Sequence, residues 1–222
     1  MTRIYLVRHC EALGNQLHIF QGHTDCGITE NGARQLERLA EKFRTIPLDG
    51  VYSSPLERAY DTAKAVARYH PLSIISSPGL IEINGGEWEG KHWEELEEKY
   101  PKDFSDWSDR PYAFSAPGGD SMKDVFRRVR DTVLSITREN KGKRVAAVTH
   151  GCAIRNFLCF ALGYPLERIN EVPWCGNTGI CVIDFDDNLV PSVAVMNDIS
   201  HLDQPPCTFE MKNWNQRKEP RP

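Results

Sequence analysis

Two short apolar runs that each lead into a histidine constrain the fold of this chain more than any other feature. The first is Ile4–Val7, which is followed by Arg8 and His9, and the second is Val145–Val148, which ends just before His150. A short uninterrupted apolar run is typical of a strand that is buried on both faces, as in parallel sheets covered by helices. We therefore expect both histidines at the carboxyl ends of parallel strands, where ligands bind in such sheets.

Segments with helical spacing separate the predicted strands. They follow Thr29 as the N-cap, start at Pro55 after a capping box at Ser54–Glu57, and resume near Trp93. Further helices are predicted over the stripe from Met122 to Ile136 and from Gly151 through Leu162. The alternation with strands predicts an α/β fold, a three-layer sandwich with a mainly parallel central sheet flanked by helices.

The end of the chain predicts two more strands and a tail. The runs 179–185 and 190–196 are separated by Asp186, Asp187 and Asn188, which are typical of a tight turn. We find no internal repeat and no linker, so residues 1–203 are predicted to form a single domain. Residues 204–222 are polar and proline-rich and are predicted to be a C-terminal tail.

Charge and composition exclude several classes of partner. The formal net charge of −4 gives no overall basic character for binding nucleic acid. No apolar segment approaches the roughly 20 residues that cross a bilayer, and the first residues do not resemble a signal peptide. The seven scattered cysteines lack zinc-site spacing. We therefore expect a cytoplasmic protein without membrane or nucleic-acid partners, and the sequence allows a homodimer.

A group of cations and imidazoles predicts the chemistry. If Arg8, Arg58, His9 and His150 meet at one sheet edge, the guanidiniums suit a phosphoryl group and a histidine nitrogen can accept it covalently. The leaving oxygen then needs a proton. Carboxyl groups in a glycine-rich loop are the candidate acids, and spacing alone does not choose among them: Glu82, Glu87 and Glu89.

Four segments, in order, resemble the signature motifs of the histidine phosphatase superfamily, which has the phosphoglycerate mutase-like fold. They are "YLVRHCEALGN", "SSPLERAYDTA", "LIEINGGEWEG" and "VTHG". The resemblance implies His9 as the phosphorylated nucleophile, Glu82 as general acid and then base, and a phosphate pocket that includes Arg8, Arg58 and His150. Asn15 matches an asparagine that contacts phosphate in the family. The remaining predicted substrate-binding residues are Gln21, Gly22 and Gly151. The family mechanism implies no metal and no cofactor.

Two features distinguish this chain within the resemblance. Cys10 replaces the glycine that usually follows the histidine, which costs strain or narrows the pocket only if that position needs a positive φ or close clearance. The chain lacks the adjacent arginine pair of true mutases, and "APGGDS" is similar to a loop of the phosphatase branch. We therefore predict a phosphomonoesterase for a small phosphorylated metabolite. The alternatives are a cofactor-dependent phosphoglycerate mutase and a non-catalytic domain that binds a phosphorylated ligand.

Two further groups of residues carry weaker predictions. His18, His23 and Cys26 invite a metal site, but they include no second clean ligand pair, so we expect none. Aromatic residues between positions 88 and 114 are divided between the core and the leaving-group side of the pocket, without a sequence signal that separates them: Trp88, Trp93, Phe104, Trp107, Tyr112 and Phe114.

Overall fold

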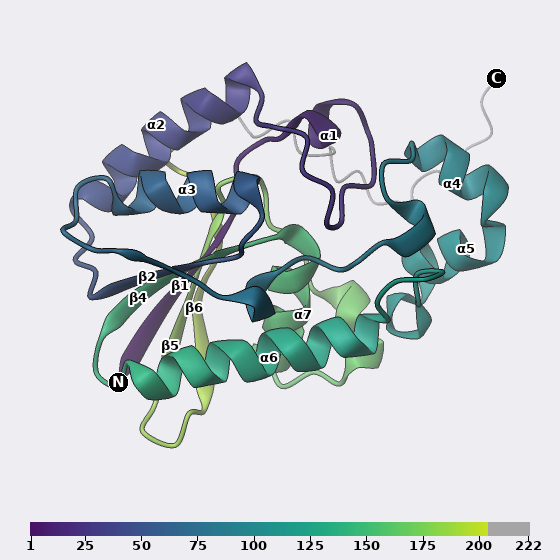
Figure 1. Ribbon diagram of the computed structural model, residues 1–222. Helices are drawn as coiled ribbons and strands as arrows, with labels where there is room; N and C mark the ends of the chain where they lie inside the picture. Colours follow the sequence, from purple (N-terminus) through teal and green to yellow (C-terminus); the bar gives the residue numbers. More distant parts are fainter. Residues whose placement is uncertain (204–222) are drawn as a thin grey trace.

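A mixed six-stranded sheet forms the centre of the fold (Figure 1). The computed structural model describes residues 1–203. The strands are β1 (Thr2–Arg8), β2 (Gly50–Ser53), β3 (Ile74–Ser76), β4 (Arg144–Thr149), β5 (Ile180–Phe185) and β6 (Pro191–Asp198). Their order is β3-β2-β4-β1-β5-β6. The strands from β3 to β1 pair in parallel, and β5 is antiparallel to both of its neighbours, β1 and β6. The predicted mainly parallel sheet is confirmed.

Helices cover both faces of the sheet (Figure 1). Ile4 and Leu6 of β1 pack in a core with α6 (Met122–Glu139) and α7 (Gly151–Ala161). Tyr5 and Val7 point to the opposite face, into a core with α2 (Glu30–Arg44) and α3 (Glu57–Ala67). Because successive side chains of a strand alternate in direction, the apolar run supplies both cores. The three-layer sandwich is therefore confirmed.

The helix starts follow the sequence signals with one exception. The Thr29 hydroxyl accepts a hydrogen bond from the Gly32 N–H and caps α2 as predicted. The predicted capping box at Ser54 is wrong, because α3 begins at Glu57 and has no side-chain cap. The Ser54 hydroxyl lies 2.7 Å from Nε2 of His150, so this side chain contacts a histidine of the predicted site.

The connections at the carboxyl ends of the parallel strands contain short helices that the sequence patterns indicated only in part. They comprise α1 (Leu13–Gln16), α4 (Trp93–Lys99), α5 (Pro101–Asp109) and 3-10 turns at Pro78–Leu80, Gly86–Trp88, Pro111–Ala113 and Leu166–Glu171. The helix α5 was not predicted. It begins at a proline, which suits the first turn of a helix, and buries Phe104 and Trp107 on one side.

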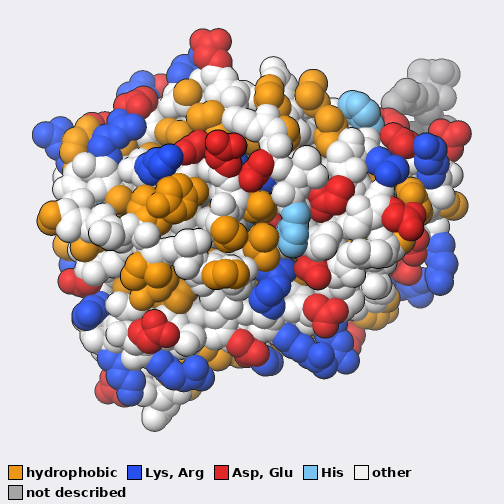
Figure 2. Space-filling view, viewed as in Figure 1, with side chains coloured by type: hydrophobic (Ala, Val, Ile, Leu, Met, Phe, Trp, Pro, Cys, Tyr) orange, Lys and Arg blue, Asp and Glu red, His pale blue; other side chains and the backbone are white. Residues whose placement is uncertain are grey.

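The surface shows no concentration of one charge on the face in Figure 2, where acidic and basic side chains are interspersed. Over residues 1–203 we find no helix with the length and apolar character to cross a membrane. The predicted tail, 204–222, lies outside the described residues.

Candidate active site

Strand register brings the two histidines together. Arg8 and Thr149 are partners in the β1–β4 pair, and the His9 N–H donates to the Thr149 carbonyl at 2.9 Å. The rings of His9 and His150 therefore leave the sheet side by side, with their centroids 5.2 Å apart. The expected meeting of the two strand-end histidines is observed.

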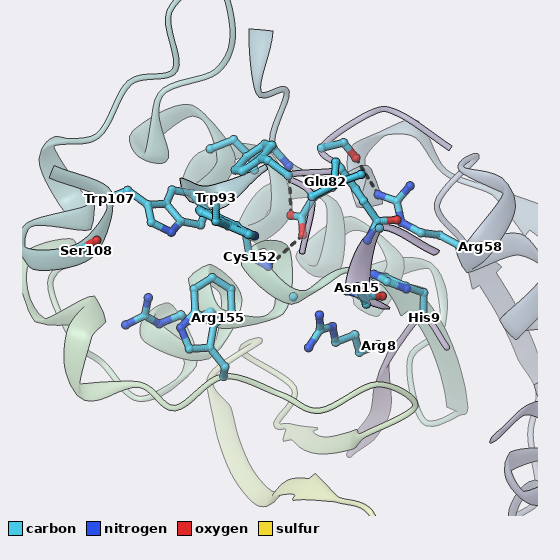
Figure 3. Close-up of a pocket in the computed structure, with 18 of the residues that line it drawn as sticks. Arg8, His9, Asn15, Arg58, Glu82, Trp93, Trp107, Ser108, Cys152 and Arg155 are labelled. Atoms are coloured by element: carbon cyan, nitrogen blue, oxygen red, sulfur yellow. Dashed lines mark hydrogen bonds between the residues drawn. The ribbon is translucent and has the colours of Figure 1, made fainter. Parts of the chain in front are cut away.

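A cavity of about 370 Å³ opens at this end of the sheet (Figure 3). Most of the predicted site residues line it: Arg8, His9, Asn15, Gln21, Gly22, Arg58, Glu82 and Gly151. His150 is fully buried, with its ring beside that of His9, and is not among the lining residues. The four sequence segments are thus brought to one place by the fold.

The surroundings of His9 hold its ring neutral and oriented. Nδ1 lies 2.6 Å from the carbonyl oxygen of Cys10, and because a carbonyl only accepts, Nδ1 carries the proton. The pKa of His9 is well below its usual range, because burial disfavours the imidazolium and the guanidiniums of Arg58 and Arg8 repel it. Nε2 is consequently left with a free lone pair, which a nucleophile requires.

Each arginine of the site is anchored on one side and unbonded on the other. Arg8 donates from Nη1 to the Cys175 carbonyl at 2.6 Å, and its buried Nε has no partner among the described residues. Arg58 donates to Asp25 Oδ1 at 2.8 Å and to the Gly22 carbonyl at 2.6 Å, and its buried Nε is likewise unbonded. Both guanidiniums therefore retain a buried donor for an anion.

His150 is anchored by the Ser54 hydroxyl at Nε2, whereas its buried Nδ1 has no partner within residues 1–203. Burial, Arg58 and His9 lower the pKa of His150 well below its usual range. The ring is neutral, and Nδ1 is the atom that remains for a further hydrogen bond.

The other predicted binding residues differ in how they contribute. Asn15 uses its side-chain oxygen to accept from the Ala12 N–H at 3.0 Å, which leaves its amide N–H₂ as a donor. Gly22 has φ of +46° and presents its carbonyl to Arg58. A Cβ placed on Gly151 would lie 3.3 Å from Nε and Cζ of Arg8. Glycine at position 151 therefore makes room for the Arg8 side chain, and the residue also lines the cavity.

Only one of the three candidate acids lines the cavity. The Glu82 carboxylate accepts a hydrogen bond from the Cys152 N–H at 3.0 Å (Figure 3) and another from the Ala153 N–H at 3.1 Å, both in the first turn of α7. Glu89 accepts four hydrogen bonds within the loops, from His23, Thr24 and Gly85. Glu87 accepts from the Tyr100 hydroxyl at the surface. The geometry favours Glu82 among the candidates that the sequence left open.

Cys10 does not narrow the cavity. Its backbone is not among the positive-φ residues, and its side chain is fully buried against Leu36, Ala40 and Ala65 under α2 and α3. Burial raises the pKa of the Cys10 thiol to about 11, which keeps it protonated and unreactive. The replacement of the family's glycine is therefore accommodated without strain, on the side of the chain away from the cavity.

The suggested metal ligands have other partners. His23 Nε2 donates to the Glu82 carbonyl at 3.0 Å, and the Cys26 thiol donates to Gln21 at 3.2 Å. Across the described part of the chain, no group of three or more His, Cys, Asp or Glu side chains is placed to hold a metal ion. These residues tie the loops around the cavity together.

The cavity wall contains residues that the sequence left unassigned and residues that it missed. Of the six aromatic candidates, Trp93 and Trp107 line the cavity, while Trp88, Phe104 and Phe114 are buried in the core and Tyr112 is exposed. Residues with no predicted role also line it: Phe20, Ser108, Cys152, Arg155, Asn170 and Trp174. They come from segments without a sequence motif. The one indication in the sequence is Arg155, which follows Gly151 by about one helical turn in α7.

Fold and cavity together define an α/β protein that presents a neutral histidine and unbonded guanidinium donors to an anion. The model of the histidine phosphatase superfamily (branch 1) matches residues 4–199. The chain therefore belongs to the histidine phosphatase superfamily.

Two relatives illustrate the range of names in this family. The chain is 34% identical to phosphoserine phosphatase 1 of Hydrogenobacter thermophilus over 187 residues, 84% of this chain and 88% of the relative. It is 29% identical to a probable phosphoglycerate mutase GpmB of Yersinia pestis over 92% of this chain and 97% of the relative.

Solved structures agree with the fold. YhfR of Bacillus stearothermophilus superposes with a TM-score of 0.87 at 30% identity, over 90% of this chain and 99% of that one. A mutant phosphoserine phosphatase from Entamoeba histolytica in complex with phosphoserine superposes with a TM-score of 0.81 at 28% identity, over 91% of this chain and all of that one. The predicted family and fold are confirmed, and family and relatives support the predicted phosphoric monoester hydrolase.

Proposed function

We propose that this protein is a metal-independent phosphomonoesterase that hydrolyses a small phosphorylated metabolite through a phosphohistidine at His9. The observation that carries the proposal is the state of that ring: neutral, with Nδ1–H bound to the Cys10 carbonyl and Nε2 left as a lone pair. The ring lines a cavity beside two guanidiniums that each retain an unbonded Nε. A nucleophile next to cationic donors suits the transfer of a phosphoryl group.

The first step forms the bond between His9 Nε2 and phosphorus and breaks the bond between phosphorus and the ester oxygen. Arg8 and Arg58 stabilise the charge on the phosphoryl oxygens in the transition state, together with Nδ1 of His150 and the amide of Asn15. The ester oxygen leaves as an alcohol with a proton from Glu82. The Oε2 atom of Glu82 accepts one hydrogen bond from the backbone, and so retains a lone-pair site for that proton.

In the second step, water attacks phosphorus, the bond between phosphorus and Nε2 breaks, and Glu82 takes up the proton of the water. Inorganic phosphate leaves, and both residues return to their starting state. The cavity wall holds Glu82 through backbone N–H groups at the start of α7, which any helix leaves without an internal partner. That anchorage fixes the position and orientation of the carboxyl group, which proton transfer in both steps requires.

The phosphatase is favoured over the mutase by what lines the cavity. A phosphoglycerate mutase must hold a second phosphate and a carboxylate as well as the transferred group, yet Arg155 is the single further arginine among the described residues that line the cavity. The match to a probable mutase keeps this second candidate in the test. An assay of 3-phosphoglycerate isomerisation with a bisphosphoglycerate primer separates the two, and rapid isomerisation would contradict our choice.

Hydrolysis of p-nitrophenyl phosphate in the presence of a chelator tests catalysis itself. We expect steady release of p-nitrophenol between about pH 5 and 8, because burial holds the pKa of His9 and of His150 well below the usual range and so favours the neutral rings. Absence of turnover throughout would favour the non-catalytic binding domain.

The sequence also predicts a single domain over residues 1–203, a cytoplasmic location and a possible homodimer, and these three stay predictions.

A further inference from the structure

The end of the cavity remote from His9 contains a second polar site. In Figure 3, Ser108, Trp107 and Arg155 lie on the opposite side of the cavity from His9 and Arg58. We call the group of Ser108, Arg155, Asn170 and Trp174 the distal subsite. All four residues line the same cavity as the proposed nucleophile, and the proposed mechanism uses none of them.

Arg155 is a buried cation without an anionic partner. Arg155 is only 7% exposed, and within residues 1–203 no carboxylate forms an ion pair with its guanidinium. Nε donates to the Val172 carbonyl at 3.0 Å and Nη2 donates to Asn170 Oδ1 at 2.9 Å. The guanidinium stacks on Trp174, with Cζ 4.7 Å from the ring centroid. These contacts fix the fork and leave Nη1 for a ligand.

A second polar atom at the same place lacks a partner. The Ser108 hydroxyl is buried and makes no hydrogen bond to any described residue, although it lines the cavity. Buried hydroxyls are normally satisfied by protein, water or ligand. A buried hydroxyl without a hydrogen bond and a guanidinium without an ion pair, in the wall of one cavity, therefore both suit an oxygen of a ligand.

The charge at the distal subsite differs from that at the phosphate site. Two arginines and Nδ1 of His150 serve the phosphoryl group, whereas Arg155 is the single cation among the described residues that line the distal end. One guanidinium matches one negative charge, so a carboxylate fits better than a second phosphate dianion. Burial lowers the pKa of Arg155, but a guanidinium stays charged throughout the physiological range.

The position of Arg155 also sets the shape of the ligand. Gly151, which abuts Arg8, and Arg155 are four residues apart in α7 and so lie on one face of the helix, about 6 Å apart along its axis. Trp174 lies between them, in contact with Arg155 and with the position of a Gly151 side chain. A ligand that reaches both sites carries its second charge beyond a spacer that packs on the indole ring.

We propose that the distal subsite binds a carboxylate on the leaving group of the substrate, with Arg155 and Ser108 as its donors. The substrate is then a phosphomonoester of a hydroxy acid. This inference rests on the proposed phosphatase activity, because the phosphoryl group must occupy the site around His9 for the leaving group to extend toward Arg155.

Matched pairs of esters test the subsite. We compare 3- and 4-carboxyphenyl phosphate with their 3- and 4-carbamoylphenyl analogues, which have nearly the same shape and no charge, and phosphoserine with phosphoethanolamine, which lacks the carboxylate. For the native protein we expect kcat/KM to favour at least one carboxylate member of these pairs about tenfold or more, mainly through a lower KM. Equal constants within all pairs, with both members hydrolysed, would overturn the subsite and leave the phosphatase intact.

Substitution of Arg155 assigns the preference. Arg155→Gln is expected to bring the ratio within the preferred pair close to one, and Arg155→Lys to restore part of it, because the ammonium keeps the charge but not the fork. A residue that only braced the 170–174 segment would change both members alike. A ratio that persists in Arg155→Gln would contradict the proposal. Failure of the native protein to hydrolyse any ester would contradict the phosphatase instead.

Discussion

At the scale of single residues, one hydrogen bond decides which atom of His9 is available for chemistry. The Cys10 carbonyl fixes the proton on Nδ1, and the buried guanidiniums of Arg8 and Arg58 keep the ring from gaining a second proton. The sequence identified these residues, but it contained no information about the tautomer. The tautomer is set by a backbone carbonyl, a group that every residue has. Its position next to His9 follows only from the folded structure.

Replacement of Glu82 tests the proposed acid. Glu82→Gln keeps the size of the side chain but removes the proton donor and acceptor. We expect kcat/KM for alkyl phosphates such as glycerol 2-phosphate to fall by about 10² to 10⁴, and for p-nitrophenyl phosphate by at least about tenfold less, because p-nitrophenolate leaves without a proton. The matched control is Glu87→Gln, a carboxylate of the same loop that lies at the surface and does not line the cavity. Equal losses on both esters in Glu82→Gln would argue against the role.

Replacement of Cys10 tests whether this departure from the family is silent. The thiol packs against Leu36, Ala40 and Ala65 and faces away from the cavity. Cys10→Gly is expected to lower the free energy of unfolding by about 1 to 2 kcal/mol, through lost packing and greater freedom of the unfolded backbone. It should leave kcat/KM within about twofold of the native value. A large gain or loss of activity, measured with p-nitrophenyl phosphate, would show that the side chain affects the site.

At the scale of elements, the parallel strands and the start of α7 place the site. The apolar runs predicted β1 and β4 and the position of both histidines, because burial on two faces leaves a clear pattern. Ser54 shows where local signals failed: its hydroxyl suited a capping box but contacts His150, which lies 96 residues away in sequence. Arg155 and Ser108 were missed for the same reason, since their importance depends on a cavity formed by segments distant in the chain.

The contact between the end of β1 and the start of α7 requires glycine at position 151, next to the Arg8 side chain. Gly151→Ala would place a methyl group 3.3 Å from the Arg8 guanidinium, a contact that requires Arg8 to shift. We expect KM for p-nitrophenyl phosphate to rise about tenfold, because the guanidinium no longer meets the phosphoryl oxygens in its native position. The matched control is Gly50→Ala in β2, where the nearest atoms lie 3.7 Å from the new methyl group. An unchanged KM in Gly151→Ala would contradict the assignment of Arg8.

At the scale of the whole molecule, buried neutral histidines make stability depend on pH. Burial lowers the pKa of His9 and His150 well below the usual range and that of His201 to about 4. Below about pH 6.5 the unfolded chain binds protons at these positions that the folded chain does not, so the free energy of unfolding falls as pH decreases. Each histidine contributes up to about 1.4 kcal/mol per pH unit until its folded-state pKa is reached.

Urea denaturation at about pH 7.5 and about pH 5.5 measures this effect. We expect a loss of a few kcal/mol at the lower pH, and a smaller loss in His201→Gln, which removes one of the three groups while sparing the cavity. Activity should not follow the same curve, since His9 and His150 remain neutral in the folded state. Equal stability at the two values would contradict the burial of uncharged imidazoles.

The measurement that tests the central claim most directly is the detection of phosphoryl transfer to His9. The protein is mixed with excess p-nitrophenyl phosphate, quenched rapidly in alkali, digested and analysed by mass spectrometry, with His70→Ala as a control histidine outside the cavity. We predict one acid-labile phosphoryl group on the peptide that contains His9, present in His70→Ala and absent in His9→Ala, which should also lose more than about 10³-fold in kcat. A phosphoryl group on another residue, or full turnover by His9→Ala, would contradict the account.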